Sequence, residues 1–285
     1  ELSFLVYGLG LSGQSVINFF KKNKIKNYTV WDDRPKKLFK NKRAKDLYQT
    51  LSKVDYIVLS PGISTINKKF LIKFKTKIIT DIDLLFLTKN FFKTIVVTGT
   101  NGKSTTCKLI SHLLKKNNFQ VLVGGNIGTP ILNLKVKKNS YLIIEASSFQ
   151  LSHSKFIKPD YGFLLNITND HLDWHGSKTN YVSSKFKIFK FQKKNQFAFI
   201  NKKLIKSFKK KKFLSKLIIP SKNNYEKIKH KIKNEYLKLS INDENMSFVF
   251  AFIKILKISE TKFIDSINSF VGLSHRYEIF LKKKN

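Results

Sequence analysis

The chain has 285 residues, of which 42% are hydrophobic, and a formal net charge of +37. This length and apolar content predict about two domains with cores of their own. The only cysteine, Cys107, excludes an internal disulfide and fits a reducing compartment, and no apolar run approaches the roughly 20 residues of a transmembrane helix. All but three of the 55 basic residues are lysines, spread over the whole chain, so AT-rich codon usage explains the charge better than a nucleic-acid partner does.

The first part of the chain predicts a small α/β unit, because short apolar runs alternate with a helical pattern and with Gly and Pro punctuation. Strands are expected at residues 3–7, 28–32, 54–59 and 77–80, with a helix near 13–22. The stretch 87–94 is expected to link this unit to a second one. We therefore predict a first domain over residues 1–92.

The second unit is expected to open with a strand at residues 94–98 and a helix near 103–116. Later elements are expected as strands at 119–123, 141–145, 161–165 and 197–201 and as helices near 245–257 and 260–269. Polar residues follow three of the apolar runs, in "GGNIG", "EASSFQ" and "NITNDH". Because ligands bind at the carboxyl ends of parallel strands, these three segments are expected to share one site.

Two glycine loops predict two separate anion-binding places. The first, "GLGLSG", contains Gly8, Gly10 and Gly13, follows a strand and opens a helix, and Asp32 comes about twenty residues later. Taken alone, this pattern suggests an NAD-binding turn, or a tight turn without a cofactor. The N–H groups at such a helix start still favour an anion.

The second loop, "GTNGKST", comes after a β-branched run and before an amphipathic helix. Its glycines let the backbone surround a phosphate, Lys103 reaches phosphate oxygens, and the Ser104 hydroxyl can ligate Mg²⁺. The spacing is two residues shorter than that of the usual phosphate loop. A second phosphate loop suits a dehydrogenase poorly, and it suits an enzyme that spends ATP on another phosphate-bearing substrate.

Polar side chains after this loop are candidate ligands. Glu145 ends the apolar run "YLIIE", and a carboxylate beside a phosphate loop is a natural Mg²⁺ ligand. His171 lies in "NITNDHLDWHG", just past another expected strand end. Asp170, Asp173 and His175 nearby favour a polar site there, and the pattern alone does not say which residue is the ligand.

Together these motifs resemble those of the Mur ligase family, the ATP-dependent amide ligases of peptidoglycan synthesis. The resemblance rests on "TGTNGKST", "GGNIG", "EASSFQL", "NITNDHLDWHG", "YVSSKFKIF" and "GLSHRYE", from about residue 3 to about residue 280. "SSFQL", "YGLGLSG" and "LSPGI" resemble the branch that adds D-glutamate. The resemblance implies an α/β protein with a Rossmann-like UDP-binding domain, then a central ATPase domain at 93–280 with a phosphate loop and a mostly parallel sheet. Residues 281–285 would start a linker to a third domain.

The resemblance also implies roles for individual residues. Lys103, His171 and Lys185 would be catalytic, with Lys185 carried as a carbamate. Mg²⁺ would be held by Ser104, Glu145, His171 and the carbamylated Lys185. ATP would be bound by Gly99, Thr100, Asn101, Gly102, Lys103, Ser104, Thr105, Asn245 and Arg276. The UDP substrate would be bound by Leu11, Ser12, Asp32, Asp33, Arg34, Ser60, Gly62 and Asn126.

The implied reaction joins D-glutamate to UDP-N-acetylmuramoyl-L-alanine through an acyl phosphate, with ATP and Mg²⁺, in a cytoplasmic monomer without a nucleic-acid or membrane partner. The adenine-contacting block of the family is matched only by "NDENMSF", in which Asn245 matches the first Asn and Phe248 replaces the second. The third domain would begin where the chain stops. The alternatives are another amino-acid-adding member of the family, or a truncated nucleotide-binding module without turnover.

Overall fold

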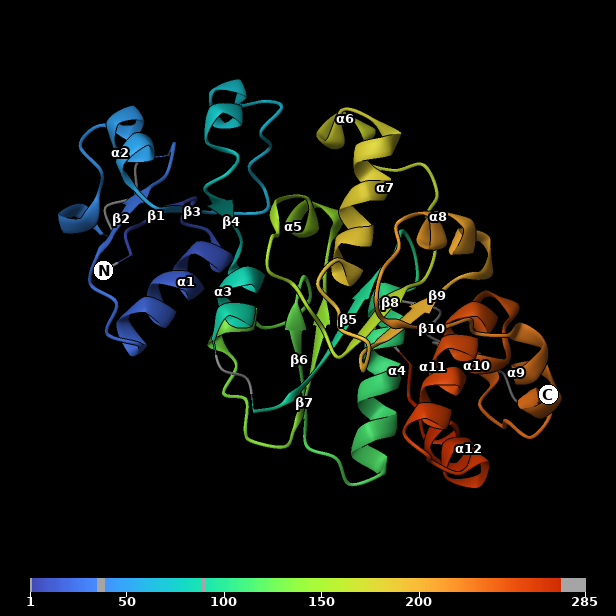
Figure 1. Ribbon diagram of the computed structural model, residues 1–285. Helices are drawn as coiled ribbons and strands as arrows, with labels where there is room; N and C mark the ends of the chain where they lie inside the picture. Colours follow the sequence, from blue (N-terminus) through green and yellow to red (C-terminus); the bar gives the residue numbers. More distant parts are fainter. Residues whose placement is uncertain (1, 35–38, 89–90, 273–285) are drawn as a thin grey trace, which may run out of the picture.

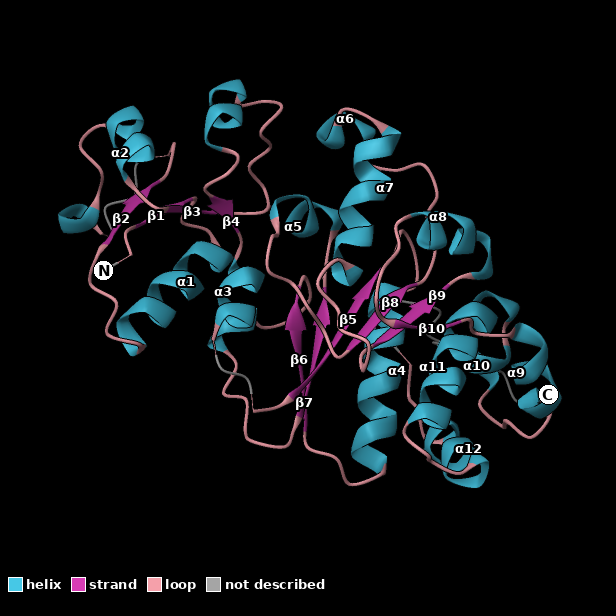
Figure 2. Cartoon of the chain, viewed as in Figure 1, coloured by secondary structure: helices cyan, strands magenta, loops and turns pink. Residues whose placement is uncertain are grey.

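The computed structural model describes residues 2–34, 39–88 and 91–272, and it contains two β-sheets flanked by helices (Figure 1). Figure 2 shows the strands of the larger sheet at the centre of the molecule and those of the smaller sheet nearer the N-terminus. Every strand pairing within the described residues is parallel. The prediction of an α/β protein with mostly parallel sheets is therefore confirmed.

The first sheet has four strands covered on both faces. Their order is β2 (Tyr28–Trp31), β1 (Phe4–Tyr7), β3 (Tyr56–Leu59) and β4 (Ile78–Ile79). The covering helices are α1 (Leu11–Lys22), α2 (Leu47–Lys53), α3 (Asp81–Leu87) and the 3-10 helix Lys69–Phe74. Phe4 and Val6 of β1 pack on the side of α1 and α3, whereas Leu5 and Tyr7 pack on the side of α2. Successive side chains of a strand point to opposite faces, which is why this sheet has two apolar cores.

The second sheet has six strands, and its central strand leads into the phosphate loop. Their order is β10 (Lys216–Ile218), β9 (Phe197–Ile200), β8 (Tyr161–Leu164), β5 (Lys93–Thr98), β7 (Tyr141–Glu145) and β6 (Val121–Gly125). Val97 of β5 is level with Glu145 on one side and with Phe163 on the other. The carboxyl ends of these three strands therefore meet at the same edge of the sheet.

Helices cover both faces of the second sheet as well (Figure 1). One face packs against α4 (Lys103–Lys116), α9 (Lys222–Lys229), α10 (Glu235–Lys238), α11 (Asp243–Ile255) and α12 (Glu260–Asn268). The other face packs against α5 (Ser148–His153), α7 (Lys178–Phe186) and α8 (Ile205–Lys210). The short α6 (Leu172–His175) precedes α7, and further 3-10 helices lie at Lys40–Lys42, Ile131–Asn133, Lys187–Phe189, Lys202–Leu204 and Ser240–Asn242.

Buried polar contacts join the parts of the chain that carry the two sheets. The carboxylate of Asp83, on α3, accepts hydrogen bonds from the backbone N–H groups of Lys155 (2.9 Å) and Phe156 (2.8 Å). The hydroxyls of Thr80 and Ser154 lie 2.9 Å apart. Because these groups are satisfied by one another away from water, separating the two parts would leave them unpaired or require their hydration.

Most of the predicted elements are present within a few residues of their expected ends. The strand expected at 119–123 is β6, displaced by two residues, and the helix expected at 245–257 is α11. The strand β10 and the short helices α2, α3 and α5 to α10 were not predicted, because elements this short show little periodicity. No helix in the described ranges is both long and apolar enough to cross a membrane.

Phe252→Ala should lower the free energy of unfolding by about 3–5 kcal/mol, because it opens a cavity in the aromatic core. The Phe252 ring lies 5.1, 5.6 and 5.9 Å from the rings of Tyr161, Phe163 and Phe199. Urea unfolding measures the change. Phe191→Ala, at an exposed position, is the control and should stay within about 0.5 kcal/mol of the parent. Equal stability of the two variants would contradict the packing described here.

Candidate active site

The phosphate loop, residues 99–102, requires glycine at its second end and is tightly packed at its first. Gly102 has a φ of +81°, and a Cβ added there would lie 2.2 Å from the Asn245 side-chain oxygen. A Cβ at Gly99 would lie 3.1 Å from Leu165. No side-chain hydrogen bond caps the start of the 14-residue α4, so the N–H groups of its first turn suit an anion.

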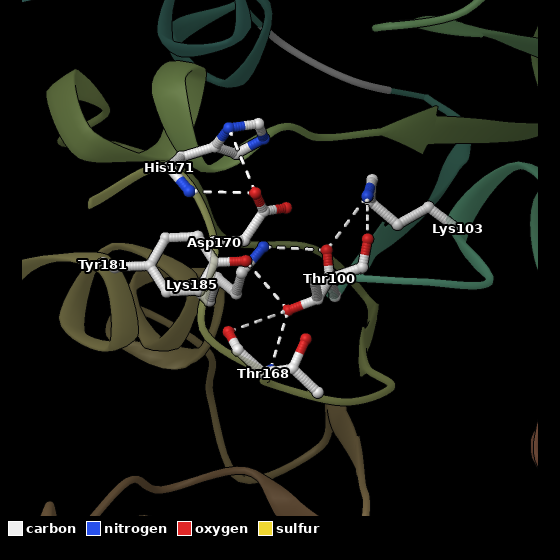
Figure 3. Close-up of polar contacts among 8 residues, drawn as sticks. Thr100, Lys103, Thr168, Asp170, His171, Tyr181 and Lys185 are labelled. Atoms are coloured by element: carbon white, nitrogen blue, oxygen red, sulfur yellow. Dashed lines mark hydrogen bonds and ion pairs between the residues drawn. The ribbon is translucent and has the colours of Figure 1, made fainter. Parts of the chain in front are cut away.

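Two lysine side chains lie against this loop (Figure 3). The ammonium of Lys103 donates to the carbonyl oxygens of Gly99 (3.0 Å) and Thr100 (2.7 Å). The ammonium of Lys185, on α7, donates to the same Gly99 oxygen at 2.8 Å. The structure thus brings together two of the three residues that were expected to be catalytic.

Lys185 lies in an unusual environment for a lysine. Its side chain is 2% exposed, and its ammonium lies 4.7 Å from the centre of the Tyr181 ring. Burial, together with the positive charge of Lys103, lowers the pKa of Lys185 to about 7, although Asp170 acts in the opposite direction. A large fraction of this amine is therefore neutral at pH 7, which is the form that reacts with CO₂.

Residues that follow β8 hold the phosphate loop in place. The Thr100 hydroxyl bonds to the Tyr181 hydroxyl (2.8 Å) and accepts from the backbone N–H of Thr168 (3.0 Å) (Figure 3). The backbone N–H of Asn101 donates to the Asn166 side chain at 2.8 Å. Tyr181 and Asn166 are site residues that the sequence did not single out, although Asn166 belongs to the polar "NITNDH" segment. The predicted gathering of strand ends accounts for Asn166, whereas Tyr181 comes from α7.

Glu145 is the clearest candidate for a metal ligand. It is 1% exposed at the end of β7, and its Oε1 accepts from the Asn126 side chain at 2.9 Å. Its Oε2 is buried and has no hydrogen-bond partner among the described residues. A buried carboxylate oxygen without a protein partner fits a cation such as Mg²⁺. No group of three or more His, Cys, Asp or Glu side chains gathers within those residues, so Ser104 and the phosphates of ATP would have to supply further ligands.

His171 lies at the same edge of the sheet and starts α6 in the left-handed conformation, with a φ of +50°. The Asp170 carboxylate accepts from the His171 backbone N–H at 2.9 Å and lies 3.4 Å from its ring nitrogen Nδ1 (Figure 3). The imidazole is exposed and packs on Phe149, with ring centres 4.7 Å apart. It is accessible to a substrate or a metal, in contrast to the buried Lys185.

Asn245 and Phe248 lie on α11, in the segment that matches the family's adenine-contacting block only in part. The Asn245 oxygen accepts from the Thr106 hydroxyl at 3.3 Å and packs against Gly102, so this side chain supports the phosphate loop. Phe248 is buried in the core, 6.2 Å from the Phe163 ring. Arg276, the remaining expected ATP contact, lies outside the described residues.

The first glycine loop has glycines of two kinds. Gly8 has a φ of +95°, and a Cβ at Gly13 would lie 1.9 Å from the Gly8 carbonyl oxygen, so both are required by the turn itself. A Cβ at Gly10 would meet nothing within 4 Å. Leu11 is 77% exposed beside it, and Ser12 is next in the helix. The open side of this loop, around Gly10, is where an anion can approach α1.

The carboxylates of Asp32 and Asp33, which follow β2, both accept hydrogen bonds from other groups of the protein. Asp32 accepts from the backbone N–H groups of Leu9 (2.6 Å) and Arg34 (2.9 Å), so it fixes the glycine loop. Asp33 accepts from Tyr7 and forms an ion pair with Lys68, both at 2.8 Å. Burial raises the pKa of Asp33, but the hydrogen bonds from Lys68, Tyr7 and Trp31 outweigh it and lower the pKa below its usual value.

Ser60 and Asn126 complete the expected substrate contacts. The Ser60 hydroxyl donates to the Gly8 carbonyl oxygen at 2.9 Å, beside the glycine loop. A Cβ added at Gly62, two residues later, would meet nothing within 4 Å. Asn126 lies in the other part of the molecule, just after β6, and is tied to Glu145. The expected substrate contacts therefore come from both sheets.

A parallel α/β fold with a glycine phosphate loop at a central strand defines the class of nucleotide-binding proteins of the phosphate-loop type. Within that class, the Mur ligase middle domain matches residues 97–268. A UDP-N-acetylmuramoylalanine–D-glutamate ligase of Rickettsia felis is 37% identical over 96% of this chain and 67% of its own length. The ligase of the same name from Buchnera aphidicola is 35% identical over 96% and 68%. The chain belongs to the Mur ligase family, and it spans about two thirds of the length of these relatives.

Solved structures of ligases share the fold. A UDP-N-acetylmuramate:L-alanyl-gamma-D-glutamyl-meso-diaminopimelate ligase from Neisseria meningitides gives a TM-score of 0.56 at 12% identity, over 96% of this chain and 99% of that one. A MurF ligase from Thermotoga maritima, in complex with ADP, gives 0.52 at 18% identity, over 96% and 64%. At such identities the likeness shows the fold alone.

Lys103→Ala should weaken the binding of Mg·ATP at least about tenfold, because a charge-assisted hydrogen bond contributes about 1.5–3 kcal/mol. In a complete enzyme the rate of acyl-phosphate formation should fall by about 10²–10³. Calorimetric titration measures the affinity. Lys108→Ala, which removes an exposed lysine from the same helix, is the matched control and should bind ATP like the parent. Equal affinity of both variants would remove Lys103 from the phosphate site.

Proposed function

We propose that this chain contains the UDP-substrate-binding and ATP-binding parts of an enzyme that adds D-glutamate to UDP-N-acetylmuramoyl-L-alanine, a step of peptidoglycan precursor synthesis. The observation that carries the proposal is the 37% identity, over 96% of the chain, with a curated ligase named for this reaction. The family is ATP-dependent, and the loop at residues 99–102 leads into a helix start without a side-chain cap, which supports phosphate binding there. We further propose that the protein acts in the cytoplasm, where nucleotide substrates are made, and that it acts as a monomer.

In this proposal the UDP substrate binds to residues 1–92 and ATP binds to residues 93–280. Leu11, Ser12 and the open side of Gly10 would receive the diphosphate at the start of α1. Asp32 would act by holding the glycine loop, and Asp33, Arg34, Ser60 and Gly62 would border the nucleoside. Residues 281–285, proposed as the start of a linker, lie outside the described residues.

The proposed reaction begins when the carboxylate of the UDP substrate attacks the γ-phosphate of ATP, which gives an acyl phosphate and ADP. The neutral D-glutamate amine then attacks the acyl carbon, and the amide forms as phosphate leaves and the nitrogen releases one proton to water. Two anions must approach each other in the first step, so cationic groups must surround them. Lys103 supplies one such charge from the loop, and His171 lies exposed at the same edge of the sheet.

Magnesium ions would neutralise phosphate charge in this site, and the residues present fit them. Ser104, at the start of α4, and the unpaired Oε2 of Glu145 are oxygen ligands of the kind that Mg²⁺ prefers. A carbamate on Lys185 would add a further anionic oxygen near His171. Thr105 is buried one residue after Ser104 and supports the first turn of α4.

Direct binding tests the proposed substrate. The chain should bind UDP-N-acetylmuramoyl-L-alanine, and Arg34→Ala should weaken this binding about tenfold, the size of one lost charge-assisted contact. Calorimetry with the UDP-muramoyl compound and with NADH measures both affinities. Arg43→Ala, an exposed arginine outside the proposed contacts, is the control. Tight NADH binding without a response to the UDP compound would overturn the proposal, and a preference for UDP-N-acetylmuramate lacking alanine would favour another member of the family.

Carbamylation of Lys185 is a separate prediction. At a fixed concentration of dissolved ¹³CO₂, a carbamate carbonyl signal should appear in the NMR spectrum and should weaken as the pH falls through about 7, because only the neutral amine reacts. Lys185→Arg should abolish the signal. Lys187→Arg, which alters a partly buried lysine two residues later whose pKa is lowered by burial to about 8, should retain it. A signal that depends on Lys187 instead would place the modification elsewhere.

A further inference from the structure

Asn166 lies two residues after the end of β8 and bonds to the phosphate loop through both its backbone and its side chain. Its backbone carbonyl oxygen accepts from the backbone N–H of Thr100 at 2.9 Å. Its side-chain oxygen accepts from the backbone N–H of Asn101 at 2.8 Å, and its side-chain nitrogen donates to the Asn101 carbonyl oxygen at 3.3 Å. One residue therefore holds two consecutive residues of the loop.

A further hydrogen bond joins Asn166 to the start of α11. Its side-chain nitrogen donates to the carboxylate of Glu244 at 2.8 Å, and Glu244 lies in the first turn of that helix, 78 residues further along the chain. The next residue, Asn245, packs against Gly102 and accepts from the Thr106 hydroxyl. The start of α11 thus supports the phosphate loop through two adjacent residues, one directly and one through Asn166.

The partners of the Asn166 side chain fix which way its amide points. The N–H of Asn101 can only donate and the carboxylate of Glu244 can only accept, so the amide oxygen must face Asn101 and the nitrogen must face Glu244. If the amide were turned over, two donors would meet at Asn101 and two acceptors would meet at Glu244. An aspartate in this position would lose the donor and bring two carboxylates together. Asparagine suits the position because its short side chain carries both a donor and an acceptor.

These contacts decide which N–H groups of the loop are left for an anion. The N–H groups of Thr100 and Asn101 both donate to Asn166. The N–H of Thr106 donates to the carbonyl oxygen of Gly102, as in a regular α-helix. The N–H groups of the first turn of α4 lie between these two points, and N–H groups in such positions commonly bind phosphate. Asn166 therefore sets the boundary between the N–H groups that hold the loop and those that face a ligand.

We propose that Asn166 is a positioning residue for ATP, which sets the phosphate loop so that the N–H groups at the start of α4 face the phosphates, and that Glu244 fixes its amide. The inference rests on the proposed function, in which this loop receives ATP. Neither residue is among the expected contacts of ATP, magnesium or the UDP substrate. A loop that is already held in its binding conformation loses less conformational entropy when the ligand arrives, so the hydrogen bonds of Asn166 strengthen ATP binding without touching ATP.

The first test removes the side-chain hydrogen bonds of Asn166 and keeps its size. In the full chain, Asn166→Leu should weaken the binding of Mg·ATP at least about tenfold, because more than one hydrogen bond is lost. Calorimetric titration measures the affinity. The affinity for UDP-N-acetylmuramoyl-L-alanine and the melting temperature should stay close to those of the parent. The matched control is Asn201→Leu, just after the neighbouring strand β9, where the side chain accepts from the backbone N–H of Lys203. This control should bind ATP like the parent.

The second test is a pair of double variants with equal net charge, and it addresses Glu244. Asn166→Asp alone should weaken ATP binding at least about tenfold, because it removes the donor and places two carboxylates side by side. Adding Glu244→Gln should restore most of the affinity, because the introduced amide can donate to the carboxylate at position 166 and so rebuild the bridge in the opposite direction. Adding Glu244→Ala instead gives the same net charge without a donor, and it should not restore the affinity.

Each other outcome is distinct. ATP binding by Asn166→Leu equal to that of the parent would overturn the inference and leave the proposed ligase function intact. A parallel loss of UDP-substrate binding and of the melting temperature would overturn it as well, because the defect would then be a general loss of structure. Equal recovery in the two double variants would show that charge alone matters and would remove the role of Glu244. A parent chain that does not bind ATP would overturn the proposed function itself, and with it this inference.

Discussion

The carbonyl oxygen of Gly99 accepts hydrogen bonds from two lysine side chains, and much of the candidate site depends on this arrangement. One ammonium belongs to Lys103 at the start of α4, and the other belongs to Lys185, 86 residues further along the chain. Two like charges at one oxygen, with one of them buried, raise the free energy of the doubly charged state. An anion between them lowers it. The repulsion is therefore relieved in one of two ways, by a bound phosphate or by loss of the proton from Lys185.

The register of the central strands explains why such distant residues meet. Val97 of β5 is level with Glu145 and Phe163, so the chain leaves three neighbouring strands at the same height. The polar segments after these strands then lie around one loop, as the bonds of Thr100 and Asn101 to the segment after β8 show. A parallel sheet covered on both faces can carry polar side chains only at its ends, because its middle is buried. The candidate site therefore lies at the end of the sheet, where the fold can hold charged side chains.

Local patterns were sufficient to predict the two glycine loops, most strands and the place of Glu145. Each depends on neighbours in sequence: a β-branched run, a glycine at a positive φ, or a carboxylate at the end of an apolar run. The supporting residues were not predictable in this way. Tyr181 lies far along the chain from the loop that it holds, and its contact with Thr100 has no local signature. Asn245 was predicted only through the family resemblance, and its contact with Thr106 and Gly102 appears only in the folded chain.

The sequence by itself determined the α/β class, the phosphate loop and the family, because these follow from periodicity and from closely spaced motifs. It predicted Asp32 and Asp33 as substrate contacts, and only the tertiary structure shows that their oxygens also accept hydrogen bonds from the Leu9 backbone, Tyr7 and Lys68. It could not distinguish Lys185 from the many other lysines by its own pattern. Only the folded structure distinguishes it. Lys185 is 2% exposed and lies near the charge of Lys103, and both effects lower its pKa relative to that of a lysine in water.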